Sequence, residues 1–334
     1  MKKFVAIIQK IPAYIMTVPL FLGIMINLIL DASMSEGSYK SYTDVVGTIS
    51  TVLMAILVFG VCSQLNFRKL GKSFVRGGVL LIYKFAISAL IGVSVGLVFG
   101  PAGFLGISAL AIVAGMSNAN TALFAGISQT YGEEPDTPSL MVLCLCNSPA
   151  FTLIVLVASG LAQVDFIQLL LPIIPMALGI LVGNIWPKIQ PILYKSALAT
   201  LPVFALLLGT TISLLQALQG GAQGLLLGLA TLILTGLLAF FVSRVYMGKG
   251  KYSPMAAGLG TTAGTAIMTP AFIASIGGAA EEIAASATAQ IAGSMIFTAA
   301  LAPVLVAMLF RYEQKRRKKR GVEQIVTAAQ LIRQ

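Results

Sequence analysis

The sequence predicts an all-α polytopic membrane protein with ten transmembrane helices, arranged as two inverted repeats of five helices. The composition, the spacing of the apolar runs, and two matching polar stretches inside apolar segments all support this fold class. Of the 334 residues, 57% are hydrophobic and only 10% are charged, whereas a soluble domain carries about a quarter charged residues. A mean hydropathy of +0.94 with apolar runs throughout indicates a chain that crosses the bilayer many times.

Ten apolar runs, separated by turn or charge signals, are the predicted spans. They cover residues 11–30, 45–66, 76–99, 104–131, 138–162, 165–186, 197–217, 222–246, 253–277 and 283–311. An even number of spans places both termini on one side of the membrane. We divide the chain into a first repeat over residues 1–162, a second, inverted repeat over residues 163–320, and a cytoplasmic tail over residues 321–334.

Basic residues collect in the loops of one side. Seven of the 22 Lys and Arg fall between Arg311 and Arg320, and others precede the first span or link spans 2–3, 6–7 and 8–9. The opposite side carries only Lys40 among acidic residues. The excess of positive charge in the loops of this side predicts that both termini face the cytoplasm. The basic charge is therefore assigned to orientation in the lipid bilayer rather than to a nucleic-acid partner.

Two polar stretches interrupt spans 4 and 9. Residues Met116–Phe124 and Gly260–Met268 align without gaps, with Ala119 opposite Ala263 and Thr121 opposite Thr265. Asn and Gly are poor helix formers, so we expect both helices to break here. Since unpaired backbone groups are costly in lipid, each break must face protein, water or a ligand. Inverted repeats with broken helices are typical of secondary transporters; the alternative is that the small residues only pack helices together.

The candidate binding residues lie at the breaks or deep in neighbouring spans. Lys84 is the one deep base; it either lines the cavity and holds an anion, or snorkels to the inner interface. The predicted substrate-binding residues are Lys84, Ser117, Asn118, Asn120, Thr121, Thr261, Thr262, Thr265, Asn147 and Gln290. The predicted ion-binding residues are Ser117, Asn120, Thr262, Gln64 and Gln290. Exposed carbonyl groups at a break can bind Na⁺, and exposed N–H groups at a half-helix start can bind a carboxylate.

The sequence offers no catalytic group and no cofactor site beyond that for a coupling ion. There is no His, and the three cysteines, Cys62, Cys144 and Cys146, lie in apolar segments without the spacing of a zinc site. No catalytic triad and no pair of deep carboxylates is present. We therefore expect that the protein is not an enzyme, and that it binds no metal other than Na⁺.

The chain resembles the 2-keto-3-deoxygluconate permease family from about residue 8 to residue 305. The resemblance is carried by the opening residues and by motifs in most spans: Ile11-Pro12, Val18–Gly23, Lys84, Asn120, Gln129-x-Tyr131-Gly132, Pro149, Gly183-Asn184 and Thr262–Pro270. It implies a proton-coupled bacterial symporter for a sugar acid. It also implies kinship with the bile acid:sodium symporter fold, in which spans 1, 2, 6 and 7 form a panel and the other spans a core with crossing, broken spans 4 and 9.

The chain departs from the family pattern at four positions. Members carry acidic residues at the positions of Ser117, Cys146 and Ser213, and a basic residue at the position of Gln64. All four are uncharged here. Either Lys84 takes the coupling proton, or the coupling ion is Na⁺ held by neutral oxygens, or the substrate differs from that of the family.

We expect an ion-coupled symporter that imports a small organic anion, 2-keto-3-deoxygluconate or a related sugar acid, by alternating access. The alternatives are a Na⁺-coupled transporter of a different carboxylate, or a channel or receptor built on the same scaffold. Monomer and homodimer both stay open as oligomeric states.

Overall fold

The computed structural model describes residues 14–65, 71–100, 103–121, 123, 124, 127, 131, 142–211, 214–247 and 254–332. In these residues the regular structure is helical, apart from one isolated bridge between Phe104 and Ile107. The predicted all-α class is confirmed for this part of the chain.

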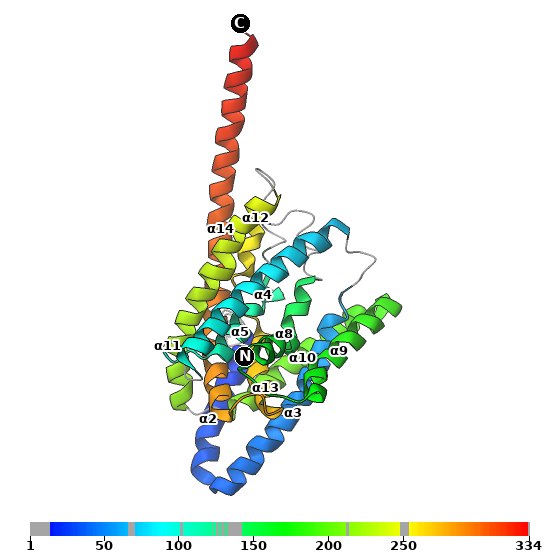
Figure 1. Cartoon of the computed structure of the whole chain (residues 1–334), viewed down its shortest axis with the longest axis vertical. Helices are drawn as coiled ribbons and strands as arrows, with labels where there is room; N and C mark the ends of the chain where they lie inside the picture. The colour runs from blue at the N-terminus through cyan, green and yellow to red at the C-terminus, as the bar shows by residue number, and fades with distance from the viewer. Residues whose placement is uncertain are drawn as a thin grey trace, which may run out of the picture.

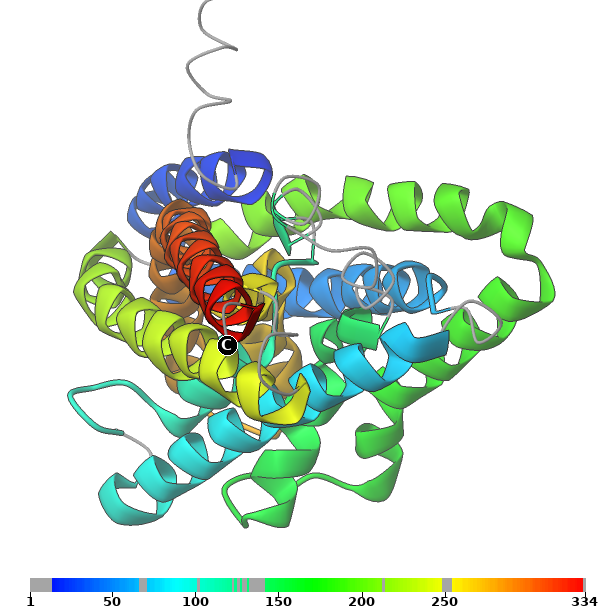
Figure 2. The same ribbon diagram turned by 90° about the horizontal axis from the view of Figure 1, so that it is seen from above.

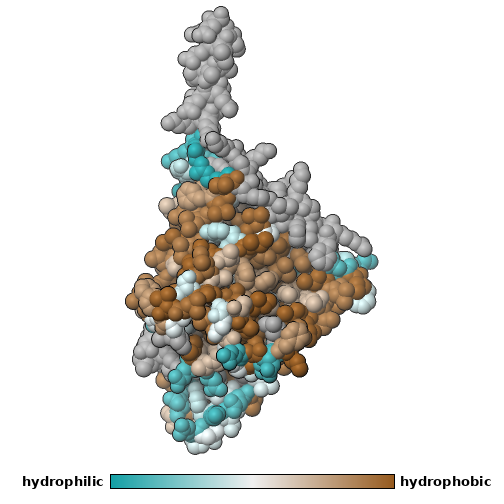
Figure 3. All heavy atoms as spheres, viewed as in Figure 1, coloured by the Kyte–Doolittle hydropathy of each residue, from teal (hydrophilic) through white to brown (hydrophobic). Residues whose placement is uncertain are grey.

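On the face shown in Figure 3, a wide apolar belt lies between two more polar ends. Five helical stretches are long and apolar enough to cross a membrane within the described residues: Gly77–Phe99, Phe166–Ile185, Pro187–Leu207, Gly220–Val245 and Glu281–Arg316. Large apolar side chains such as Phe21, Ile82 and Leu97 are more than half exposed on these and neighbouring helices. Lipid rather than water is the solvent that suits such a surface.

The elements follow the predicted spans in order. The first half contains α2 (Tyr14–Ser33), α3 (Glu36–Cys62), α4 (Gly71–Phe99), α5 (Ala109–Ser117), η2 (Cys144–Asn147) and α8 (Pro149–Ala158). The second half contains α9 (Phe166–Ile185), η3 (Pro187–Ile189), α10 (Gln190–Gly209), α11 (Leu214–Ala230), the π-helix η4 (Thr231–Leu237), α12 (Leu238–Met247), η5 (Pro254–Leu259), η6 (Gly264–Ile267), α13 (Met268–Ser275) and α14 (Glu281–Ile332).

Several helix boundaries differ from the predicted spans: α3 begins at Glu36 rather than at residue 45, and α10 covers Gln190–Gly209 rather than residues 197–217. Two further differences have identifiable reasons. Span 5 contains a bend at Ser148, which is extended with a ψ of 136°. The following Pro149 disfavours the helical conformation at Ser148 and then starts α8. Helix α14 runs far beyond the predicted end at residue 311 and projects from the rest of the molecule (Figure 1). Its second half is rich in Lys, Arg, Glu and Gln, all of which favour a helix.

The helices pack in two groups. Helix α10 packs against α2 and α3, and α3 packs against α9; we refer to these four helices as the panel. The other described helices form the core, in which α11 packs along α14 and α4 packs on α5. Seen from above (Figure 2), α9 and α10 border one side of the molecule, with α11 and α14 toward the other.

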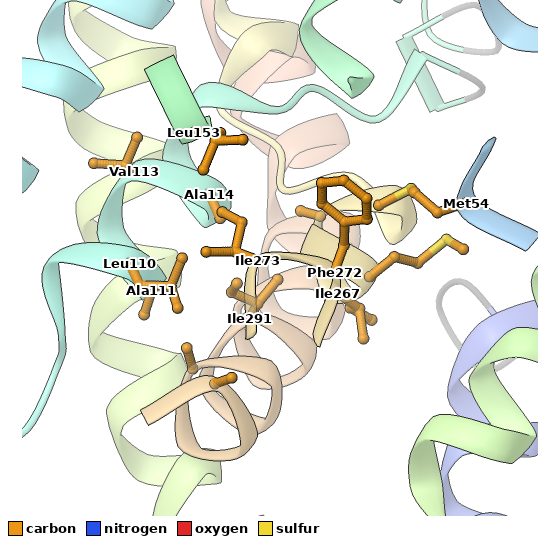
Figure 4. Close-up of a cluster of buried hydrophobic side chains, with 14 of the residues drawn as sticks. Met54, Leu110, Ala111, Val113, Ala114, Leu153, Ile267, Phe272, Ile273 and Ile291 are labelled. Atoms are coloured by element: carbon orange, nitrogen blue, oxygen red, sulfur yellow. The ribbon is translucent and has the colours of Figure 1, made fainter. Parts of the chain in front are cut away.

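Buried apolar side chains from both groups form one cluster (Figure 4). Leu110, Val113 and Ala114 of α5 lie close to Leu153 of α8 and Ile273 of α13. All five side chains are nearly or completely buried. This cluster holds α5, α8 and α13 together; α5 ends at the first polar stretch, and α13 begins at the end of the second.

Close helix contacts in the panel require glycine, which leads to the first prediction. A Cβ on Gly23 of α2 would lie 2.7 Å from Gly209 Cα of α10, whereas a Cβ on Gly37 of α3 would meet nothing within 4 Å. We expect Gly23→Ala to lower the free energy of unfolding by about 1–3 kcal/mol, because the backbone of α10 must move away to make room for the methyl group. The matched Gly37→Ala should leave it unchanged or raise it slightly, because alanine favours a helix. Thermal unfolding of both variants in detergent tests this, and equal melting temperatures would contradict it.

Candidate functional site

The first break follows α5. The helix ends at Ser117, and Asn118 is extended with φ of −82° and ψ of 141°. The Asn118 Nδ2 atom donates to the carbonyl oxygen of Ala114 at 2.7 Å, which satisfies a carbonyl group at the helix end. The Asn120 Oδ1 atom accepts from the Leu123 N–H at 3.0 Å. Asn120 thus caps the backbone that follows, as asparagine commonly does at a helix start.

The second break lies between η5 and η6. Residues 261–263 are not helical, and Ala263 is extended with φ of −74° and ψ of 148°. The Thr262 N–H donates to Thr298 Oγ1 at 3.0 Å, and Thr262 Oγ1 shares a hydrogen bond of 2.7 Å with Ser294 Oγ. Both partners belong to α14, so this long helix holds the extended backbone in place.

The two breaks contact each other. The backbone N–H of Asn120 donates to Thr261 Oγ1 at 3.1 Å, across 141 positions of sequence. The same hydroxyl group donates to the carbonyl oxygen of Gly258 at 3.2 Å. One threonine therefore joins the interrupted backbone of span 4 to that of span 9.

Lys84 of α4 reaches the second break and is completely buried, with 0% of its surface exposed. Its Nζ atom donates to the carbonyl oxygens of Leu259 at 2.6 Å and Thr261 at 3.2 Å, and to Thr235 Oγ1 at 3.1 Å. The side chain therefore does not snorkel to the interface. An ammonium group has three donors, and the protein supplies an oxygen for each.

The π-helix η4 brings these groups together. It carries Thr235, and its Leu234 carbonyl oxygen accepts from the hydroxyl group of Tyr83, the neighbour of Lys84. A Cβ on Gly236 would lie 2.8 Å from Gly260 Cα, so the two backbones touch. Short π-helices inside α-helices are frequent at functional sites.

Several buried oxygen atoms near the breaks have no hydrogen-bond partner in the described part of the chain. They are Asn118 Oδ1, Thr152 Oγ1, Thr265 Oγ1 and Thr269 Oγ1. Asn118 and Thr265 belong to the two breaks, and Thr152 and Thr269 lie on α8 and α13, which pack together. Buried oxygens of this kind are suited to meet a ligand, because leaving them unpaired is costly.

The structure brings part of the predicted set together and places the rest elsewhere. Lys84, Asn120 and Thr261 are linked through the contacts above, and Ser117, Asn118, Thr121, Thr262 and Thr265 belong to the same two breaks.

The other predicted residues lie away from the breaks or are not described. Gln64 donates to the carbonyl oxygen of Gln190 at 2.7 Å, in the panel. Gln290 donates to the carbonyl oxygen of Gly106 at 2.8 Å and to Gln223 Oε1 at 2.7 Å. The side chain of Asn147 and all of Ser213 lie outside the described residues.

Sequence reasoning missed Thr235, Ser294 and Thr298. Each lies in an apolar helix, where a hydroxyl group ordinarily bonds to the helix's own backbone. The signal that could have drawn attention to Thr235 is the pair Thr231 and Thr235, one turn apart within a run of leucines.

Comparison with known proteins decides the family. The model of the 2-keto-3-deoxygluconate permease family matches residues 5–315. The chain belongs to the 2-keto-3-deoxygluconate permease family. This family comprises transporters rather than enzymes, so the predicted resemblance and the predicted absence of an enzyme class are confirmed.

Named permeases match over nearly their whole length. The chain is 32% identical to 2-keto-3-deoxygluconate permease 1 of Salmonella typhimurium over 308 residues, covering 92% of this chain and 96% of the relative. It is 31% identical to the 2-keto-3-deoxygluconate permease of Xanthomonas euvesicatoria over 314 residues, which cover 92% of this chain and 96% of that relative. The 2-keto-3-deoxygluconate permease of Escherichia coli O157:H7 is 30% identical over 325 residues, which cover 94% of this chain and 96% of that relative.

Among solved structures, the permease-family chain matches a sodium proton antiporter, MjNhaP1 from Methanocaldococcus jannaschii. The TM-score is 0.57 at 14% identity, over 88% of this chain and 92% of the antiporter. This likeness concerns the fold alone. Together with the apolar belt, the family places the chain among multi-pass bacterial membrane transporters.

Proposed function

We propose that this protein imports 2-keto-3-deoxygluconate or a closely related sugar acid as an ion-coupled symporter. The observation that carries the proposal is the contact between two helix breaks, through Asn120 and Thr261, beside a buried ammonium group. Such breaks expose backbone groups in the middle of a membrane protein, where substrate and ion can use them. The names of the relatives supply the substrate.

The carboxylate of the substrate is proposed to bind at the start of η6 and α13. The N-cap residue Ala263 provides no side-chain hydrogen bond to the first turn, and Thr265 Oγ1 is unpartnered. A helix start favours an anion through its N–H groups and dipole. Lys84 contributes a buried positive charge at the same break, while Ser117, Asn118, Asn120 and Thr121 face the substrate from the first break.

Import follows from movement of the core against the panel around this site, in an architecture of two inverted five-helix repeats. Both termini lie in the cytoplasm of a bacterium, and the protein sits in the inner membrane. The basic second half of α14 and the acidic turn between α2 and α3 lie at opposite ends of the molecule (Figure 1), which supports this orientation.

The coupling ion is a proton or Na⁺. A proton would use Lys84, and Na⁺ would use neutral oxygens of Ser117, Asn120 and Thr262. The second candidate, Na⁺-driven transport of a different carboxylate, is favoured by one observation: Ser117, Asn118, Thr261 and Thr262 provide uncharged oxygens at the breaks. Hard cations such as Na⁺ bind oxygen ligands of this type.

The experiment is uptake of labelled 2-keto-3-deoxygluconate into proteoliposomes with imposed proton and Na⁺ gradients, each applied alone. We expect saturable accumulation that one of the gradients drives and that unlabelled substrate competes away. Uptake indifferent to both gradients would refute coupling, and uptake without saturation or counterflow would indicate a channel. If 2-keto-3-deoxygluconate is not taken up, a thermal-shift screen of sugar acids and carboxylates, with and without Na⁺, identifies the substrate. A ligand that binds the native state raises its melting temperature.

A further inference from the structure

The surroundings of the Lys84 ammonium group have the composition of a cation-binding site. Its three hydrogen-bond partners in the described part of the chain are all neutral oxygens, two from carbonyl groups and one from a hydroxyl group. The Nζ–O distances range from 2.6 to 3.2 Å. Carbonyl and hydroxyl oxygens also bind monovalent metal ions at broken helices.

The break itself makes these oxygens available. Leu259 ends η5, and Thr261 lies in the extended stretch after it. Carbonyl groups at the end of a helix have no partner within the helix and carry the negative end of its dipole. A cation at this position is thus stabilised by the backbone, whether or not the cation is part of a side chain.

In the described part of the chain, the oxygens hydrogen-bonded to the Lys84 ammonium group belong to neutral dipoles. The described acidic side chains are Asp31, Glu36, Asp44, Asp165, Glu281, Glu282 and Glu313, and all except Glu313 are exposed. Glu313 is buried on α14, two residues after the basic residue Arg311. A buried charge is very costly unless it is paired or hydrogen-bonded, so the three oxygens must be arranged specifically for a cation.

We propose that the Lys84 ammonium group is a built-in cation that fills a cation-binding site at the second helix break. Removing the side chain opens this site to a free monovalent cation, either Na⁺ or a small alkylammonium ion. The ligands of the free ion are the carbonyl oxygens of Leu259 and Thr261, the hydroxyl oxygen of Thr235, and water admitted to the vacated space.

The role of the Lys84 charge in transport rests on the proposed function. An anionic substrate brings a negative charge into the core, and a cation at the break compensates for it. In this protein the compensating charge at this position is carried by a side chain of the chain itself. The native protein therefore has no need of free Na⁺ at the position of the Lys84 ammonium group.

Three substitutions separate the charge of Lys84 from its volume. Lys84→Ala removes the ammonium group and empties the space that the side chain occupies. Lys84→Met removes the charge but fills the space with a flexible side chain of similar length. Lys84→Ser repeats the emptying substitution with an additional hydroxyl group. A free cation can enter the Ala and Ser variants but not the Met variant.

The test is thermal unfolding of the purified full-length variants in detergent, in chloride salts of Na⁺, methylammonium or choline at equal ionic strength. We expect Na⁺ or methylammonium to raise the Tm of Lys84→Ala and Lys84→Ser by about 2–4 °C relative to choline, which is too large for the site. The difference between the two ions identifies which cation fits. The native protein and Lys84→Met lack the vacated space, so their Tm should rise less in Na⁺ or methylammonium than the Tm of the two emptied variants.

Equal melting temperatures of the Ala and Ser variants in all three salts would overturn the proposal. So would an equal Na⁺ response in Lys84→Met, since the ion would then bind elsewhere. If neither emptied variant folds in any salt while Lys84→Met folds, the proposal also fails, because a filled site should restore the fold. These outcomes do not depend on uptake, so they are independent of whether 2-keto-3-deoxygluconate is transported.

Discussion

Uptake of 2-keto-3-deoxygluconate into proteoliposomes is expected to fall at least about 30-fold when Lys84 is replaced by methionine. A unit charge about 8 Å from a carboxylate contributes about 2 kcal/mol at an effective dielectric constant of about 20, which corresponds to that factor. Lys84 is completely buried at the second break, so water cannot replace its charge. The loss of donors to Leu259 and Thr261 also leaves the break less well held.

The control for this substitution is Lys188→Met, since Lys188 is exposed on the short helix η3. Uptake by the Lys188→Met variant should match uptake by the native protein. Size-exclusion elution and thermal unfolding show whether Lys84→Met is folded, which separates loss of binding from loss of protein. Native uptake by folded Lys84→Met would contradict a role for this charge in transport.

The second large effect is expected at Thr261, the residue that joins the two breaks. Thr261→Val keeps the shape of the side chain but removes the hydroxyl group, leaving the Asn120 N–H without its acceptor and the Gly258 carbonyl oxygen without that donor. An unpaired buried polar group costs about 1–3 kcal/mol. We expect stability to fall by this amount and uptake to fall about tenfold or more, because the crossing is no longer held together.

Thr261→Ser is the matched control because serine keeps the hydroxyl group and loses only a methyl group. It should retain most of the uptake and stability of the native protein. Initial rates over a range of substrate concentrations, together with thermal unfolding, measure both effects. If the valine and serine variants transport equally well, the hydrogen bond between the breaks has no part in the transport cycle.

Much of the fold could be predicted because the membrane imposes strong constraints on sequence. A chain with so few charges must place its apolar runs in lipid, and each run that is long enough must be helical to satisfy its backbone. The breaks were predictable for a similar reason. Asn118, Asn120 and Gly260 interrupt apolar segments with residues that disfavour a helix, and the structure leaves the helical conformation at both stretches.

The sequence by itself determined that the chain is helical and apolar enough for a membrane, that two helices break, and that one lysine lies deep. Only the tertiary structure decided what that lysine contacts. Lys84 and Thr235 are 151 positions apart in the sequence. Gln290 donates a hydrogen bond to the carbonyl oxygen of Gly106, which is 184 positions away. Helix formation and breakage depend on neighbouring residues and on the solvent, which local sequence reveals. Contacts between distant side chains depend on how whole helices pack, and no local pattern specifies that.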